Sequence, residues 1–196
     1  TWTGGAADEG ALAGENWDGG IAPGAVNGAV ISDAPDAVLS TGTADWKALT
    51  IGSVANKTGT LKVTGDGVLN LTPDGTGNNS FAAITMGSVN KASGVLEIDG
   101  GSVNAYSLNT PNCAANATVN MKSGTFNITH WVDWGRNANG NQIFNHTGGN
   151  VMVGDNLWIG RDNNGTGVWS MSGGNLYHTG GTFRLGYKTA GTKGVF

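Results

Sequence analysis

A short apolar motif recurs along most of this 196-residue chain at nearly constant spacing. In each copy, two apolar residues separated by one residue are followed by a glycine or an asparagine. The six copies occupy residues 49–52, 84–87, 106–109, 132–135, 157–160 and 183–186. Their last residues are 35, 22, 26, 25 and 26 positions apart, and the long interval carries a turn-rich insertion at residues 73–81. Such a period predicts a repeat architecture in which each copy contacts only its two neighbours.

Each period contains three short segments in which apolar and polar residues alternate. In the fourth period these are residues 132–135, 143–146 and 151–153. Alternation places successive side chains on opposite faces of a strand, and the inward positions are apolar or aromatic except at His146 and His178. We therefore predict an all-β parallel β-helix (β-solenoid) with about three short strands per turn of about 25 residues. A two-sheet sandwich also uses short strands, but it does not require a fixed period.

The repeat divides the chain into two predicted regions, an irregular N-terminal cap at residues 1–46 and a solenoid of about five to six turns at residues 47–196. A cap is expected because the end of a solenoid leaves strand edges without partners. Residues 28–31 and 37–39 are expected to be strands of this cap. At the other end, residues 194–196 repeat the start of an earlier strand and stop in mid-turn. We expect that a longer natural chain or another molecule completes this edge.

Charge is distributed unevenly along the sequence. Residues 1–46 contain seven acidic residues and no Lys or Arg, whereas residues 184–196 contain Arg184, Lys188 and Lys193 and no acidic residue. The formal net charge of −4 argues against a nucleic-acid partner, for which a basic patch is expected.

Composition excludes several other classes. The 35 glycines do not recur at every third position, which excludes collagen. No apolar run approaches the roughly 18 residues of a membrane-spanning helix. Cys113 is the single cysteine, so an internal disulfide is excluded and a buried thiol is expected. The first residue is Thr1 rather than Met, which is typical of a chain whose signal peptide has been removed, and we expect a secreted protein.

The start of the chain reads Trp2-Thr-Gly-Gly and then Asn16-Trp17-Asp-Gly-Gly-Ile-Ala-Pro23, before the repeated turns. This arrangement resembles the β-strand repeats of autotransporter passenger domains and of PEP-CTERM-type exoproteins of bacteria, over nearly the whole chain. The resemblance implies export, a β-helix, and a role in surface display or in an extracellular matrix. It implies no shared catalytic residues.

Three apolar side chains occupy outward positions that are otherwise mostly polar, namely Met152, Trp158 and Tyr177. Trp158 is expected between Asp133 of the previous turn and Arg184 of the next, with a cation–π contact from the arginine. Met152 and Tyr177 are expected side by side in another column. Such a face fits lateral contact with a protein or binding of a sugar ring, although these side chains can also cover one another.

Two arginines, Arg136 and Arg161, follow the corner glycine of successive turns, with Tyr187 aligned after them. Pectate-lyase-like β-helix enzymes place basic side chains beside carboxylates that bind Ca²⁺. Here only Asp133 and Asp162 lie on that flank. We therefore expect a solvated corner with local hydrogen bonds.

The remaining polar residues form no recognisable catalytic or metal site. His146 and His178 are expected to be buried and hydrogen-bonded, and His130 to be exposed. Residues 162–165 and 74–77 are sequences that hold Ca²⁺ weakly or form Asx turns without an ion. We expect neither an enzyme nor a resident cofactor.

These features together predict a secreted structural β-solenoid that self-associates head-to-tail into extracellular fibres or a surface layer. The basic end of one copy would dock on the acidic end of the next. The residues assigned to this contact are Asp8, Glu9, Glu15, Asp18, Lys188, Lys193 and Phe196. Two alternatives stay open: a carbohydrate-binding or polysaccharide-processing β-helix that works through Trp158, and a fragment of a larger adhesin passenger.

Overall fold

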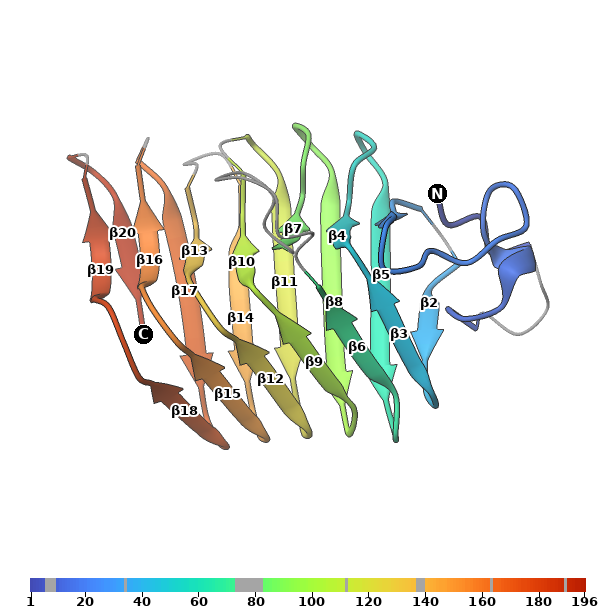
Figure 1. The fold of residues 1–196 in the computed structure, drawn as a ribbon. Coiled ribbons are helices and arrows are strands. Elements are labelled where there is room, and N and C mark those ends of the chain that lie inside the picture. The colour runs from blue at the N-terminus through green and yellow to red at the C-terminus, as the bar shows by residue number, and fades with distance from the viewer. Residues whose placement is uncertain are drawn as a thin grey trace.

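The computed structural model describes residues 1–5, 10–33, 35–72, 83–111, 113–136, 140–162, 164–188 and 190–196. These residues are mostly β-strand and form three parallel sheets wound as a solenoid (Figure 1). Within the described ranges, two sheets have seven strands each and the third has six. The predicted parallel β-solenoid is confirmed. The predicted insertion at residues 73–81 lies outside the described residues.

Every third strand along the chain belongs to the same sheet. Sheet one contains β1 (Gly28–Ile31), β4 (Ala48–Ile51), β7 (Ala83–Met86), β10 (Ser107–Asn109), β13 (Val132–Trp134), β16 (Leu157–Arg161) and β19 (Phe183–Tyr187). Sheet two contains β2 (Ala37–Leu39), β5 (Thr58–Thr64), β8 (Ser93–Asp99), β11 (Asn116–Met121), β14 (Gln142–His146), β17 (Thr166–Met171) and β20 (Lys193–Val195). Sheet three contains β3 (Thr43–Trp46), β6 (Val68–Leu71), β9 (Ser102–Ala105), β12 (Thr125–Ile128), β15 (Asn150–Val153) and β18 (Asn175–His178). A short 3₁₀ helix, η1 (Gly14–Asn16), lies in the N-terminal segment.

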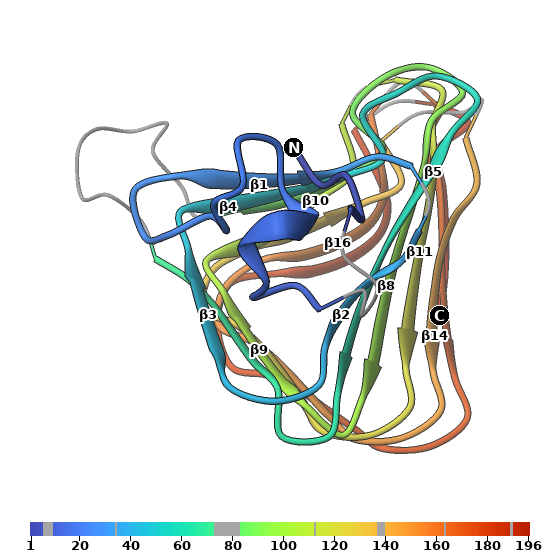
Figure 2. The same ribbon diagram turned by 90° about the vertical axis from the view of Figure 1, so that its right-hand side faces the viewer.

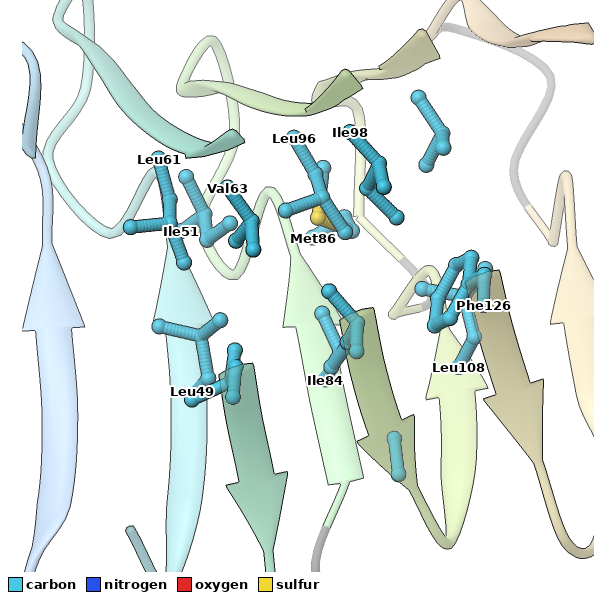
Figure 3. Packing of buried hydrophobic residues seen from close by; sticks show 14 of the residues in the cluster. Leu49, Ile51, Leu61, Val63, Ile84, Met86, Leu96, Ile98, Leu108 and Phe126 are labelled. Carbon is cyan, nitrogen blue, oxygen red and sulfur yellow. The ribbon is translucent and has the colours of Figure 1, made fainter. Parts of the chain in front are cut away.

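Viewed along the axis, the three sheets enclose a triangular core (Figure 2). Each strand pairs in parallel with its counterpart one turn away, so that Leu49 lies beside Ile84, and Ile84 beside Leu108. The same inward positions of successive turns therefore form continuous columns of buried side chains, as Figure 3 shows for these residues. Burial of these columns supplies the main driving force for folding, because little else in a charge-poor chain can do so.

Aromatic residues continue the columns toward the C-terminal turns. The rings of Phe144 and Trp169 are stacked with centroids 3.8 Å apart and an interplanar angle of 5°. His146 lies between Met121 and Met171 in its column, as predicted, and is fully buried. Burial lowers the pKa of His146, because removal from water disfavours the charged imidazolium. This histidine is therefore a neutral core residue.

Glycine at the sharp corners allows the chain to turn between sheets one and two. Gly52 has a φ of +78°, which side-chain-bearing residues rarely adopt. A Cβ atom at this position would lie 2.4 Å from the carbonyl oxygen of Ser93 in the next turn. The recurring glycine of the repeat is thus required both by the backbone angle and by the close stacking of turns.

Substitution of this corner glycine is expected to destabilise the fold. Gly52→Ala should lower the free energy of unfolding by at least about 1 kcal/mol, because the left-handed conformation alone costs that much for alanine. Gly24→Ala is the matched control, since Gly24 has no positive φ and a Cβ there would meet no atom within 4 Å. Equilibrium denaturation of both variants measures the difference. Equal stability of the two variants would contradict this account of the repeat.

The solenoid begins earlier than the sequence pattern indicates. The strands β1, β2 and β3 open sheets one, two and three, so the regular turns start at Gly28 and not at Lys47. The first turn lacks the corner glycine by which the repeat is recognised. Ser32 occupies that position after Ile31, and its buried hydroxyl bonds to Ser53.

The segment before Gly28 covers the first turn. The backbone N–H of Trp2 donates to the carbonyl oxygen of Val30, and that of Ala11 donates to the carbonyl oxygen of Val38. The indole ring of Trp17 meets Trp2 at 5.2 Å and Trp46 at 5.5 Å, both edge-on. The predicted capping role therefore belongs to this shorter N-terminal segment, which bonds to strands of the first turn.

The third copy of the repeat is shifted by two residues from its predicted alignment. Leu108, rather than Tyr106, pairs with Ile84 on one side and with Val132 on the other. The next inward position is Thr110, a polar residue that breaks the apolar pattern on which the alignment depended. Its hydroxyl is buried, donates to the carbonyl oxygen of Asp133 (3.2 Å) and accepts from the backbone N–H of Gly135 (2.8 Å).

No helix in the described part of the chain is long and apolar enough to cross a membrane.

Candidate ligand-binding site

A hollow of about 530 Å³ lies on the outer face of sheet one. Its floor is a column of outward side chains from four successive turns: Thr85, Asn109, Asp133 and Trp158. Because parallel strands lie about 4.8 Å apart, this column extends over roughly 14 Å. The predicted position of Trp158, between Asp133 and Arg184, is confirmed by the strand register.

Two tryptophans and a proline bound the hollow. Trp131 immediately precedes β13, and its indole N–H donates to Asn109 Oδ1 at 2.8 Å, which fixes the ring beside the floor. Trp158 closes the end toward the C-terminal turns, and its indole N–H donates to Thr182 Oγ1 at 3.3 Å. Pro111 lies at the opposite end of β10 from Trp131. The hollow therefore combines polar side chains with two aromatic rings.

A closed ring of ion pairs forms the side of the hollow near the corner between sheets one and two. Arg161 Nη1 lies 2.8 Å from Asp133 Oδ2, and Arg161 Nε lies 3.3 Å from Asp162 Oδ2. Arg136 completes the ring, with its Nε 3.4 Å from Asp133 Oδ2 and its Nη2 3.4 Å from Asp162 Oδ2. Lys188 Nζ adds a further contact at 3.5 Å from Asp162 Oδ1. The two arginines and two aspartates of the ring balance in formal charge, and Lys188 adds one further positive charge beside it.

The ring is mostly shielded from solvent, which corrects the expectation of a solvated corner. The side chain of Asp133 is 5% exposed and that of Arg161 is 17% exposed. Asp133 Oδ1 is buried and has no hydrogen-bond partner within the described protein, whereas the buried Nε atoms of Arg136 and Arg161 face carboxylate oxygens at 3.4 and 3.3 Å. An unpaired buried acceptor is costly, so Asp133 Oδ1 favours a ligand that can donate a hydrogen bond.

Burial also changes the acidity of the central carboxyl group. Desolvation raises the pKa of Asp133 from 3.8 to about 6, although the charges of Arg136 and Arg161 act in the opposite direction.

The predicted cation–π partner of Trp158 is wrong. The guanidinium of Arg161 lies over the Trp158 ring, 4.2 Å from its centroid, whereas that of Arg184 lies 4.0 Å from the centroid of Tyr187. Arg184 does follow Trp158 in the column, but its side chain extends along its own strand to Tyr187. The repeat pattern does not predict Asn109, Thr110 and Pro111 on this face, because β10 is shifted by two residues, and it does not predict Trp131, which precedes β13.

The other predicted candidates lie elsewhere. Met152 and Tyr177 are neighbours, as predicted, but on sheet three, so they do not join the Trp158 face. His178 is half-buried and its Nε2 lies 2.7 Å from the carbonyl oxygen of Asp155. His130 is partly exposed, with its Nδ1 2.6 Å from Asp155 Oδ2.

The structure offers little support for a metal site. The described residues contain no group of three or more His, Cys, Asp or Glu side chains that could hold a metal ion. The carboxylate of Asp162 is surrounded by three cationic side chains, which disfavours Ca²⁺ at residues 162–165. Residues 74–77 lie outside the described ranges. The thiol of Cys113 is only partly buried, contrary to expectation, and its Sγ lies 3.0 Å from the carbonyl oxygen of Gly87.

The described residues assigned to head-to-tail assembly lie toward the two ends of the solenoid. Asp8 and Glu9 lie outside the described residues, whereas Glu15 and Asp18 belong to the N-terminal segment. Lys188 is held by Asp162 in the ring, and Lys193 and Phe196 lie at the opposite end of the solenoid from the N-terminal segment (Figure 1).

Part of the acidity of the first 46 residues is neutralised locally. Lys57 Nζ lies 2.8 Å from Asp33 Oδ2, and Lys62 Nζ lies 2.7 Å from Asp36 Oδ2. The difference in charge between the two ends of the molecule is therefore smaller than the sequence indicates.

Comparisons with known proteins give no relative. No family model matches the sequence, and neither curated proteins nor solved structures give a match.

The raised pKa of Asp133 gives a pH dependence with a defined sign. Between about pH 4 and pH 6 the carboxyl group ionises in the unfolded chain but stays protonated in the folded chain, so its contribution to stability falls as pH rises. The Asp133→Asn variant lacks this titration. Its free energy of unfolding should therefore rise relative to the wild type by roughly 2 kcal/mol between pH 4 and pH 6. Denaturation of both proteins at the two pH values checks the sign, and a relative fall would show that the arginines dominate.

Proposed function

We propose that this chain is a carbohydrate-binding β-solenoid and that the hollow on sheet one binds a neutral saccharide. The observation that carries the proposal is Asp133, which lines a hollow bounded by Trp131 and Trp158 and whose buried Oδ1 has no hydrogen-bond partner among the residues that the structure describes. A sugar hydroxyl donates to such an oxygen and accepts from a neighbouring N–H group.

The charge of the site selects among ligand classes. Two arginines and two aspartates alternate around the ring, so an anionic ligand meets Asp133 and a cationic one meets Arg136 and Arg161. A neutral polyhydroxylated ligand avoids both repulsions. The tryptophan rings add apolar area against which the C–H groups of a sugar ring can pack, as aromatic side chains do in many binding sites.

The cellular setting belongs to the same proposal. The resemblance of the repeats to those of passenger-type and PEP-CTERM-type exoproteins supports export and display at a cell surface or in a matrix. A saccharide site on the side of a solenoid suits such a location, because the outer face of the sheet is accessible along its length.

Binding is tested with cello-, manno- and chito-oligosaccharides, first on an array and then by calorimetry. For the oligosaccharide that binds, Asp133→Asn and Trp158→Ala should each weaken binding about tenfold, equivalent to about 1.4 kcal/mol. Tyr177→Ala is the matched control, because it removes an exposed aromatic ring from sheet three. The proposal fails if none of the three series binds, or if the control weakens binding as much as the site variants do. Circular dichroism confirms that each variant is folded.

Exposed apolar side chains favour head-to-tail self-association as a second candidate function. Phe183, Leu185, Val195 and Phe196 are between 45% and 52% exposed; the first three lie on β19 and β20, the last strands of their sheets, and Phe196 follows β20. The basic Arg184 and Lys193 lie among them, so the acidic Glu15 and Asp18 of a second copy would complement this end. The N-terminal segment already bonds to β1 and β2, so the contact would form on that segment and not by strand addition.

Sedimentation velocity at low and high salt tests this second candidate. Concentration-dependent oligomers that dissociate in high salt are expected, because the contact includes opposite charges. The Leu185→Lys variant should stay monomeric at concentrations where the wild type assembles. A wild type that stays monomeric at high concentration and low salt excludes head-to-tail assembly.

A further inference from the structure

A second hollow, of about 340 Å³, lies on the outer face of sheet three. Its floor is a ladder of polar side chains from successive turns. Asn70 Nδ2 donates to Asp45 Oδ1 at 2.9 Å, and Asn104 Nδ2 donates to Asn70 Oδ1 at 2.9 Å. Tyr106 forms the side of this hollow that faces the corner between sheets three and one. The floor is again polar and the adjoining wall aromatic.

An aromatic ridge separates the two hollows and contributes a wall to each. The ring centroids of Tyr106 and His130 are 4.7 Å apart, and those of His130 and Trp131 are 4.5 Å apart. Tyr106 borders the hollow on sheet three, whereas Trp131 borders the hollow on sheet one. The two hollows therefore meet at one edge of the triangular solenoid, where sheet three turns into sheet one (Figure 2).

Contacts with neighbouring turns hold the ridge in position. His130 Nδ1 lies 2.6 Å from Asp155 Oδ2, and the indole N–H of Trp131 donates to Asn109 Oδ1 at 2.8 Å. Both partners belong to neighbouring turns, so the rings are fixed by the scaffold before a ligand arrives. A rigid aromatic surface of this kind lowers the entropic cost of binding.

We propose that the two hollows are subsites of one groove that holds an extended neutral polysaccharide chain across the edge formed by Tyr106, His130 and Trp131. This inference rests on the carbohydrate-binding function proposed above and adds the length and course of the ligand. One part of the chain contacts the Asp133 floor and a second part contacts the amide ladder. The sugar rings between them pack on the aromatic ridge.

The neutral character of the ligand follows from both floors. In the first floor Asp133 faces two arginines, and in the second floor Asn70 and Asn104 form a ladder of amide groups that ends at the carboxylate of Asp45, which disfavours an anionic chain. Linked binding at two subsites makes the second contact intramolecular, so affinity should rise with chain length until both hollows are filled.

The inference is tested by titrating the wild type with one oligosaccharide series, from the disaccharide to the octasaccharide, using the sugar that binds on the array. Affinity should rise by at least about tenfold once the chain is long enough to reach both hollows. Asn104→Ala should remove that gain and leave disaccharide binding unchanged, because the first hollow stays intact.

Asn127→Ala is the matched control for this variant. Asn127 is the next residue in the same column, directly beside Asn104, but it does not border the second hollow. The Asn127→Ala variant should therefore bind the longer oligosaccharides as tightly as the wild type does. Equal effects of the two variants on the octasaccharide would overturn the proposed groove.

The outcomes separate this inference from the function on which it rests. Binding that is lost in Asp133→Asn but does not depend on chain length overturns the extended groove alone. Absence of binding to any oligosaccharide overturns both. Binding of an extended peptide library across both hollows, without oligosaccharide binding, also overturns the assignment of a polysaccharide ligand.

Discussion

The structure depends on one constraint, which is that every strand must lie in register beside its copy in the adjacent turns. In a parallel stack each backbone group bonds to a neighbouring turn, so a side chain that points inward in one turn has an inward side chain directly above and below it. Core residues must therefore be matched along the axis. Side chains on the outer face are less restricted, because outward columns need only be compatible with solvent or with a ligand. The site uses one such column, from Thr85 to Trp158.

Much of the fold was predictable because this constraint leaves a periodic signal. The apolar alternation identified the three strands of each turn, and the corner glycines identified the turns, since no other residue accepts both the backbone angle and the contact at Gly52. The signal failed where polar residues replaced the expected type. Ser32 at the first corner concealed one turn, and Thr110 in the core displaced the alignment of β10 by two residues. In both cases buried hydrogen bonds satisfied the polar group, which sequence periodicity does not reveal.

The candidate site was only partly predictable for the same reason. The column that contains Asp133, Trp158 and Arg184 followed directly from the period. The burial of Asp133 did not, because it results from Arg136 and Arg161 folding over the carboxylate from the adjacent corners. Asn109 and Trp131 were absent from the predicted face, since one was misaligned and the other precedes its strand. The site combines residues within strands, residues at corners and a residue that precedes its strand. Its location can therefore be found only from the three-dimensional path of the chain.

The floor of the hollow has a consequence for how the molecule unfolds. In a solenoid each turn is bonded only to the turns on either side, so local opening at one place has little effect a few turns away. The column from Thr85 to Trp158 crosses four turns, and a ligand that lies along it contacts all four at once. A bound ligand therefore couples the opening of turns that are not neighbours, which backbone hydrogen bonds between adjacent turns do not do. The liganded segment would open as one cooperative unit, whereas the same turns without ligand can separate one after another.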